Sequence, residues 1–382
     1  MIDRRTMLAG SAALTAAAAV GPRIAYARTD GEKRLLVLVM RGATDGLALA
    51  APLADPAFRA ARTKWLGAYA DAPKLDGTFA LHPALSETAK LYRAGRAAIV
   101  HAVATDYRDR SHFDAQNLLE TGGQKPFERR DGFLNRFLGL LNGREAPAIA
   151  LASALPLALR GENPASTFAP SVLPDASAGL LERIPGLYAG DPQLGGLWQA
   201  ATKTAAIADA SDMSTLKRSQ DAGSLAARML ADPQGARIVM LDLPGWDSHA
   251  NQLGMLQRRF SQFDTLLAAF REGIGPAWQD TLVLAVTEFG RTVAINGTNG
   301  TDHGTGSAAL LAGGKVKGGR VLADWPGLGP QQLYDNRDLR PTTSLESLVA
   351  GALAAHFSLD ADKVIRTLYP GRRTPPIGGL LA

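Results

Sequence analysis

One segment near the C-terminus, residues 281–319, constrains the fold most strongly. It opens with an apolar run, residues 282–286, which is typical of a strand buried within a parallel sheet. Glu288 and Arg291 follow directly, and open α/β sheets bind their ligands at the carboxyl ends of such strands. The segment therefore predicts a parallel sheet with a ligand site at one edge.

The second half of this segment is a loop rich in glycine, asparagine and threonine, too polar to form core. It carries Asp302 and His303 between glycines, and a second apolar run, 308–312, returns the chain to the sheet. A carboxylate and an imidazole on such a loop suit a metal ion or an anion. Residues 304–309 match G-x-G-x-x-A, but they follow a loop and lead into a strand, so we do not expect a dinucleotide cofactor.

The rest of the chain alternates apolar runs with amphipathic stretches. Further strands are expected at 34–40, 97–103, 148–152 and 237–243. With 382 residues, of which 46% are hydrophobic, the chain can bury a large core. This alternation predicts a three-layer α/β/α fold with a mainly parallel sheet. We expect residues 28–382 to form a single domain, in which 153–232 are a helical insertion or cap.

The N-terminus has the features of an export signal. Arg4 and Arg5 form a twin-arginine pair, an alanine-rich stretch follows, and residues 25–27 give a small-x-small cleavage site. A short membrane helix is the alternative, but the apolar run is too short for one. We expect residues 1–27 to be a twin-arginine signal peptide. The protein would then meet the Tat translocase during export, become periplasmic or secreted, and keep no stable membrane anchor.

Composition excludes some classes of partner and ligand. The formal net charge is +5, but no basic tract is interleaved with aromatic residues, so we expect no nucleic-acid partner. The chain has no cysteine, which removes thiolates as metal ligands. Any metal ion must therefore be held by oxygen and imidazole nitrogen.

Reactive side chains follow expected strands at four separate places. They are Asp45, Ser111 with His112, Asp247 with His249, and Glu288 with the Asp302–His303 pair. Because the strand ends that precede helices lie at one edge of a parallel sheet, we expect these groups to converge. Carboxylates and imidazoles can hold one or two divalent ions, which lower the pKa of a bound hydroxyl or water.

Each of these residues also has a purely structural explanation. Ser111 and Asp247 precede expected helices, where serine and aspartate are favoured N-caps, and Ser111 with Asp114 fits a capping box. Asp45 can serve simply to stabilise its own turn. A serine at a helix N-terminus, however, also lies beside free backbone amides that suit an oxyanion.

Several motifs together resemble a known family. They are RGATDGL, RSHFDAQNLLETG, GWDSHANQ, TEFGRT and NGTNGTDHGTG followed by LLAGGKVKGG, in that order along almost the whole mature chain. The chain resembles the exported bacterial family called domain of unknown function 1501. That family is in turn similar to the alkaline phosphatase superfamily, which also contains sulfatases and cofactor-independent phosphoglycerate mutases.

The resemblance implies a two-metal site that hydrolyses or transfers ester groups. By position, Ser111 matches the nucleophile at a helix N-terminus, and Asp45 matches the metal ligand after the first strand. Asp247 and His249 match a pair of ligands for the other metal. The remaining implied ligands are Glu288, where the superfamily has the aspartate of an Asp-His pair, and His303 with Asp302 beside it.

The sequence departs from the superfamily pattern in two places. Asp247 and His249 are two residues apart rather than four, and such neighbours do not share a helix face, so His249 can bind only from a non-helical turn. Phe289 follows Glu288 where the pattern has a histidine. One metal would then have only oxygen ligands, which favours Mg, Ca or Mn over Zn or leaves that site empty. The identity of the cation stays open among these four.

Two functions remain in competition. The first is a metal-dependent hydrolase of small anionic phosphate or sulfate esters, with Ser111 as nucleophile and Arg291 or Arg108 binding the anion. The second is a non-catalytic binding protein of the cell envelope that retains the fold. Phe289, which cannot bind a metal, favours the second. Whether the protein is an enzyme therefore depends on how these side chains are arranged.

Overall fold

The computed structural model describes residues 33–141, 148–169, 178–188, a few positions between 190 and 202, 218–233 and 235–382. The signal peptide that we expect at residues 1–27 lies outside the described residues. Among the described residues, no helix combines the length and apolar composition needed to cross a bilayer.

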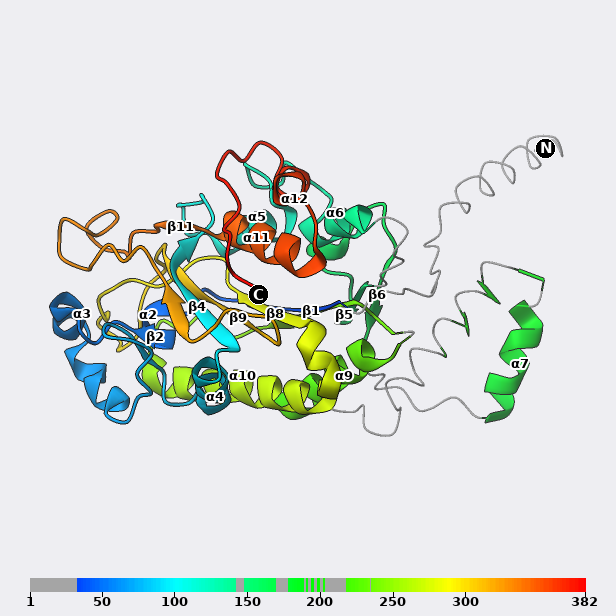
Figure 1. Ribbon diagram of the computed structural model, residues 1–382, viewed down its shortest axis with the longest axis horizontal. Helices are drawn as coiled ribbons and strands as arrows, with labels where there is room; N and C mark the ends of the chain where they lie inside the picture. The colour runs from blue at the N-terminus through cyan, green and yellow to red at the C-terminus, as the bar shows by residue number, and fades with distance from the viewer. Residues whose placement is uncertain are drawn as a thin grey trace, which may run out of the picture.

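A nine-stranded sheet forms the centre of the described part of the chain (Figure 1). Its strand order is β10-β4-β9-β8-β1-β7-β5-β6, and β11 pairs with β4. The strands are β1 (Arg34–Met40), β4 (Ala97–Ala104), β5 (Ala148–Leu151), β6 (Ala165–Phe168), β7 (Ile238–Leu243), β8 (Thr281–Val286), β9 (Ser307–Gly313), β10 (Arg320–Leu322) and β11 (Thr343–Ser344). All pairings are parallel except those of β9, which runs antiparallel to β4 and β8.

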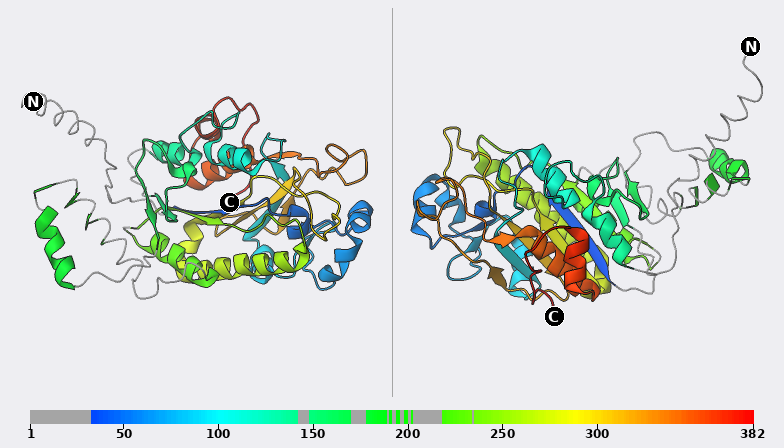
Figure 2. Two further views of the ribbon diagram at one scale, coloured as in Figure 1. Left: turned by 180° about the vertical axis from the view of Figure 1, so that it is seen from behind. Right: turned by 90° about the horizontal axis from the view of Figure 1, so that it is seen from above.

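Helices cover both faces of this sheet (Figures 1 and 2). One face carries α4 (Ser86–Arg93), α9 (Ser219–Ala231) and α10 (Gln252–Ile274); the other carries α5 (His112–Thr121), α6 (Phe133–Leu140), α11 (Leu345–Phe357) and α12 (Ala361–Leu368). Even-numbered residues of β1 pack with the first set and odd-numbered residues with α6, α11 and α12. Burial on both faces explains why the strands are apolar throughout. The predicted three-layer α/β/α fold is confirmed.

The stretch 153–232 contributes to these layers at both ends. β6 extends the main sheet by pairing with β5, and α9 packs along α10. Both elements therefore lie within the main layers rather than in a separate cap. Helix α7 (Ala178–Tyr188) lies apart from the layers in Figures 1 and 2. Residues 203–217 lie outside the described residues.

Shorter elements complete the described fold. They are α2 (Gly46–Leu49), β2 (Ala50–Ala51), α3 (Pro56–Ala61), η2 (Thr63–Tyr69), β3 (Ala80–Leu81), η3 (Leu157–Leu159) and η5 (Gly275–Asp280). β2 and β3 pair as a small antiparallel sheet. The segment from α2 to β3 packs beside the carboxyl end of β1, where it borders the site described next (Figure 1).

Candidate metal centre

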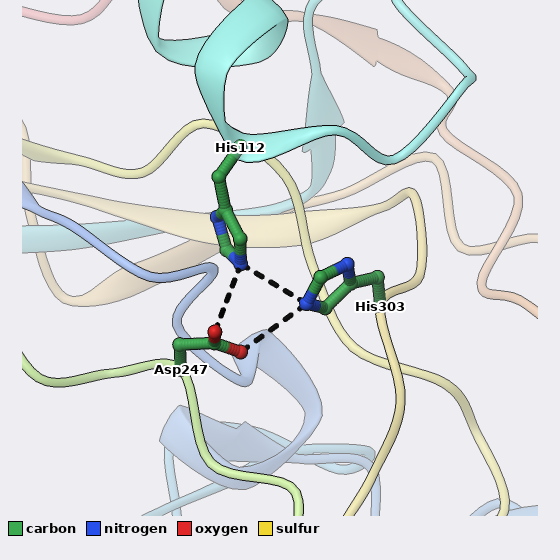
Figure 3. Close-up of side chains that lie close together, drawn as sticks. All are labelled: His112, Asp247 and His303. Carbon is green, nitrogen blue, oxygen red and sulfur yellow. Dashed lines mark hydrogen bonds and ion pairs between the residues drawn. The ribbon is translucent and has the colours of Figure 1, made fainter.

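Three separate segments meet at the edge of the sheet where β4, β7 and β8 end. His112 is the first residue of α5, Asp247 lies in the loop after β7, and His303 lies in the loop between β8 and β9. Because β9 runs antiparallel to β8, it starts at this same edge and the loop returns there. The three side chains point toward one another in Figure 3, and one ligand atom from each lies within 4.8 Å of the others.

The distances between these atoms are short. His112 Nε2 lies 3.0 Å from His303 Nε2, and the carboxylate of Asp247 lies 3.2 Å from His303 Nε2 and 3.4 Å from His112 Nε2. His249 extends the group, since its Nε2 lies 2.9 Å from Asp247 Oδ1 and 3.1 Å from His303 Nε2. Residues 244–249 are non-helical, which meets the condition that His249 must satisfy to share a site with Asp247. Three imidazoles and one carboxylate thus converge.

The outer nitrogen of each ring has an acceptor as its partner. His303 Nδ1 lies 2.9 Å from the carbonyl oxygen of Arg110, and His112 Nδ1 lies 2.9 Å from Glu288 Oε1. Carbonyl and carboxylate oxygens only accept, so both Nδ1 atoms are assigned the proton. In the neutral rings, both Nε2 atoms then carry lone pairs that face each other. Such an arrangement is repulsive unless a cation or a proton lies between them.

A tetrahedral cation fits this geometry. Metal–ligand bonds of about 2.0–2.1 Å, as for Zn²⁺, place neighbouring ligand atoms about 3.3 Å apart. The separations of 3.0, 3.2 and 3.4 Å among His112, His303 and Asp247 are close to this value. Hydrogen bonds from the outer ring nitrogens to carbonyl or carboxylate oxygens are also characteristic of histidines that bind metals. The described part of the chain therefore contains a His/Asp cluster suited to a divalent ion.

Glu288 lies behind His112 rather than in the cluster. Its Oε1 accepts from Gly42 N at 2.8 Å and Gln116 Nε2 at 3.1 Å, in addition to His112. The side chain is fully buried. Burial alone would raise the pKa of Glu288, but the hydrogen bonds from His112, Gln116 and Gly42 outweigh it and lower the pKa. Glu288 is thus an ionised carboxylate that orients the His112 imidazole.

His112 contacts both residues of the Glu288-Phe289 pair. Its ring stacks on Phe289 with centroids 4.8 Å apart, while its Nδ1 contacts Glu288. The Glu288-Phe289 pair therefore orients a histidine supplied by α5. The oxygen-only ligand set that the sequence implied is not assembled, because Glu288 is bonded to His112 and Asp45 lies elsewhere.

Asp45 is not directed at the cluster. Its Oδ2 accepts from Arg62 Nη1 at 2.7 Å and from Gln252 Nε2 at 2.7 Å, and its Oδ1 caps α2 through Ala48 N at 3.1 Å. Asp45 and Arg62 are each 1% exposed. The structural explanation, a carboxylate that stabilises its own turn, therefore describes Asp45, with the addition of a buried ion pair.

Arg291 is buried and its donors point to protein atoms. Nη1 donates to Asp247 Oδ1 at 2.9 Å, and Nη2 donates to the carbonyl oxygens of Ser248 and Thr301 at 2.6 and 2.8 Å. Burial alone would raise the pKa of Asp247, but the Arg291 hydrogen bond and the charges of His112 and Arg291 outweigh it and lower the pKa to about 2. Arg291, expected as an anion clamp, here orients Asp247 and keeps it ionised.

Two other predicted residues, Ser111 and Asp302, lie beside the cluster, next to His112 and His249 respectively. Ser111 precedes α5 directly, and its side chain makes no capping hydrogen bond, in contrast to the capping-box interpretation. Asp247 caps no helix either, since α10 begins after Asn251. Asp302 is half-exposed and lies 3.4 Å from His249 Nδ1. The hydrogen bond from Asn296 is the main reason why the pKa of Asp302 is lowered.

Sequence reasoning did not include His112 among the candidate metal ligands. His112 follows Ser111 at the strand-to-helix junction, and only the serine has an expected role there. Two signals in the sequence indicate it: its place directly after Ser111, and a Glu288-Phe289 pair that lacks a histidine. Gln116, one helical turn after His112, contacts the same oxygen of Glu288.

The protonation of His112 predicts how metal binding depends on pH. Burial alone would lower the pKa of His112, but the hydrogen bond and charge of Glu288 and the charge of Asp247 outweigh it and raise the pKa. Because the folded pKa exceeds the unfolded value of about 6.5, the charged ring stabilises the metal-free protein below that pH, and this stabilisation is lost as pH rises through the folded pKa. The proton competes with a metal for Nε2, so Zn²⁺ affinity should fall about tenfold per pH unit below the folded pKa.

Competition with a chromophoric chelator from about pH 5.5 to about pH 8.5 measures this dependence. Glu288→Gln removes the charge that raises the pKa of His112, so the inflection should move to lower pH in this variant. An inflection at the same pH in both proteins would contradict the role of Glu288 in raising the pKa of His112.

Residues 191–369 match the sequence model of a family described as "Protein of unknown function (DUF1501)". The DUF1501 resemblance is confirmed over these residues. The match contains Asp247, His249 and His303, whereas His112 lies outside it. No curated protein matches the chain.

Several solved structures are similar to this DUF1501-like chain at low identity. One is the C-terminal periplasmic domain of EcEptC from Escherichia coli, 11% identical, with a TM-score of 0.42 over 92% of each chain. A putative sulfatase from Bacteroides thetaiotaomicron is 10% identical, with a TM-score of 0.43 over 91% of this chain and 76% of that one. The alkaline phosphatase of the Antarctic bacterium TAB5 is 12% identical, with a TM-score of 0.38 over 75% of this chain and 92% of that one. Likeness at this level concerns the fold alone and transfers no activity.

Proposed function

We propose that this protein is an exported metal-dependent hydrolase of phosphate or sulfate esters. The observation that supports it best is the convergence of the Nε2 atoms of His112, His249 and His303 on the carboxylate of Asp247. The signal sequence predicted at residues 1–27 would place the enzyme in the periplasm or outside the cell. A small anionic ester is the substrate class that such a site would accept.

The roles of the residues follow from their contacts. His112, His303 and Asp247, with His249, would hold a divalent ion, and a set of imidazoles with one carboxylate suits Zn²⁺ among the four cations. A bound ion supplies charge that polarises an ester oxygen and lowers the pKa of a coordinated hydroxyl or water. Arg291 keeps Asp247 ionised, and Glu288 fixes the tautomer of His112.

Ser111 is the candidate nucleophile. It directly precedes the ligand His112, and no capping bond engages its hydroxyl. The first backbone amides of α5 and the positive end of the helix dipole lie beside it, an environment that favours an anionic ester group. A serine hydroxyl needs an activating base or a cation to become a nucleophile, and the neighbouring cluster would provide it.

Replacing Ser111 by alanine tests this role. We expect turnover of an aryl phosphate or aryl sulfate by the Zn²⁺-loaded protein to fall at least about 1,000-fold, while the protein stays folded and retains its metal. Ser86→Ala is the matched control, because Ser86 begins α4 and contacts Asp264 instead of the cluster. Undiminished turnover in Ser111→Ala would refute the nucleophile assignment.

One observation favours the non-catalytic alternative, a cell-envelope binding protein. Arg291 directs its donors to Asp247, Ser248 and Thr301, so the expected anion clamp is not free to bind a substrate. Under this alternative, the purified protein would carry a divalent ion but hydrolyse no member of a broad panel of esters. Protein that takes up no divalent ion would refute the hydrolase proposal.

A further inference from the structure

Behind the metal ligands, buried polar side chains form a continuous series of hydrogen bonds. Its members are at most 1% exposed, and they are Arg62, Asp45, Gln252, Thr301 and Arg291. The series ends at the ligand Asp247. We refer to it as the buried relay. Arg62 precedes η2, Asp45 lies in the turn before α2, and Gln252 begins α10. Arg291 and Thr301 lie in the loop between β8 and β9.

Every link of the relay lies within hydrogen-bond distance, and all but one are 2.9 Å or shorter. Asp45 Oδ2 accepts from Arg62 Nη1 and from Gln252 Nε2, both at 2.7 Å. Thr301 Oγ1 donates to Gln252 Oε1 at 2.6 Å and accepts from Arg291 Nε at 3.2 Å. Arg291 Nη1 then donates to Asp247 Oδ1 at 2.9 Å.

The direction of these bonds is fixed by the two ends. Asp45 can only accept, so Gln252 must turn its NH₂ group toward it and its oxygen toward Thr301. Thr301 has a single proton, which it donates to that oxygen, and its lone pairs therefore face Arg291. Arg291 can only donate, so the donor and acceptor roles along the whole series have a single possible arrangement. Because each member is buried, breaking one of these hydrogen bonds would leave a polar group without a partner. This costs about 1–3 kcal/mol of stability.

The relay also joins the segments that carry the ligands. Gln252 lies five positions after Asp247, and Thr301 lies two positions before His303. A hydrogen bond between Gln252 and Thr301 therefore ties the loop after β7 to the loop between β8 and β9. The same pair aims the guanidinium of Arg291 at Asp247. The position of the Asp247 carboxylate thus depends on residues that do not belong to the cluster.

We propose that Gln252 and Thr301 are positioning residues of the metal centre, which act through Arg291 on the carboxylate of Asp247. This inference rests on the proposed metal site. Asp45 and Arg62 would then also serve the metal centre, because their buried ion pair anchors the far end of the relay. Partners that orient metal ligands typically contribute 10- to 100-fold to metal affinity, about the size of effect expected for the relay.

The test compares Zn²⁺ affinity by chelator competition in matched variants of the full mature chain. Thr301→Val keeps the shape but removes the hydroxyl, and we expect about tenfold or greater loss of affinity. Thr301→Ser keeps the hydroxyl and should bind Zn²⁺ as the wild type does. Gln252→Met, which removes the amide, should match Thr301→Val. The double variant should lose little more than either single one, because both act through one series of bonds.

A control separates positioning from general destabilisation. Asn135 is another buried amide, whose Nδ2 donates to the carbonyl oxygens of Leu159 and Asn163, which belong neither to the cluster nor to the relay. Asn135→Leu should lower the stability to denaturant without changing Zn²⁺ affinity. Wild-type affinity in both Thr301→Val and Gln252→Met would overturn this inference alone. A wild-type protein without Zn²⁺ affinity would instead refute the proposed function, and the inference with it.

Discussion

Replacing Asp247 by asparagine is expected to weaken Zn²⁺ binding by more than about 100-fold, beyond the loss caused by partners that only orient ligands. Among the residues that the structure describes, Asp247 is the one acidic group in contact with all three imidazoles, at 2.9 to 3.4 Å. An amide removes its negative charge and leaves the buried guanidinium of Arg291 facing a neutral group. Turnover of any ester that depends on the metal should be lost with it.

The fold should survive this substitution. The oxygen of the asparagine side chain can still accept from Arg291 Nη1, and the Asp247 side chain is 43% exposed, so water reaches this pair, unlike the buried pair of Asp45 and Arg62. Asp302→Asn is the matched control, because Asp302 is also acidic and exposed but lies behind His249 and outside the cluster. Its loss should weaken Zn²⁺ binding by about tenfold at most. Chelator competition measures the Zn²⁺ affinity of both variants, and metal analysis measures their metal content. Equal losses of Zn²⁺ affinity would contradict the assignment of Asp247 as a ligand.

Asp45→Ala is expected to lower the free energy of unfolding by about 3–5 kcal/mol. The substitution leaves the Arg62 guanidinium, which is 1% exposed, without its carboxylate partner. Arg62 keeps bonds to the carbonyl oxygens of Thr292 and Val293, but these carry no full negative charge. An uncompensated buried charge is among the most destabilising changes that a single substitution can cause.

A solvent-accessible ion pair provides the comparison. Asp280 contacts Lys33 at 2.9 Å and Lys315 at 2.8 Å, and all three side chains are partly exposed. Asp280→Ala should lower the free energy of unfolding by about 1 kcal/mol or less. Unfolding in urea, monitored by circular dichroism, measures the free energy of unfolding of both variants. Should Asp45→Ala destabilise no more than Asp280→Ala, Asp45 would not be the structural anchor described above.

The sequence predicted the layers of the fold because burial leaves a strong pattern. Strands covered on both faces are continuous apolar runs, and β1, β7 and β8 lie where those runs are. It did not predict the strand order or the antiparallel direction of β9. Those depend on pairings between segments that lie far apart in the chain. The direction of β9 matters most, since it returns Asp302 and His303 to the edge where the other ligands lie.

The sequence also indicated which loops meet at the cluster, because Asp247, His249 and His303 each follow or precede an apolar run at one sheet edge. The partners of each side chain were decided by tertiary structure alone. Asp45 pairs with Arg62, Arg291 turns inward to Asp247, and His112 joins the cluster. A motif specifies which residue is present at a position. Whether a carboxylate or guanidinium faces a metal site or another protein group depends on the charges that folding brings beside it, because a buried charge needs a partner.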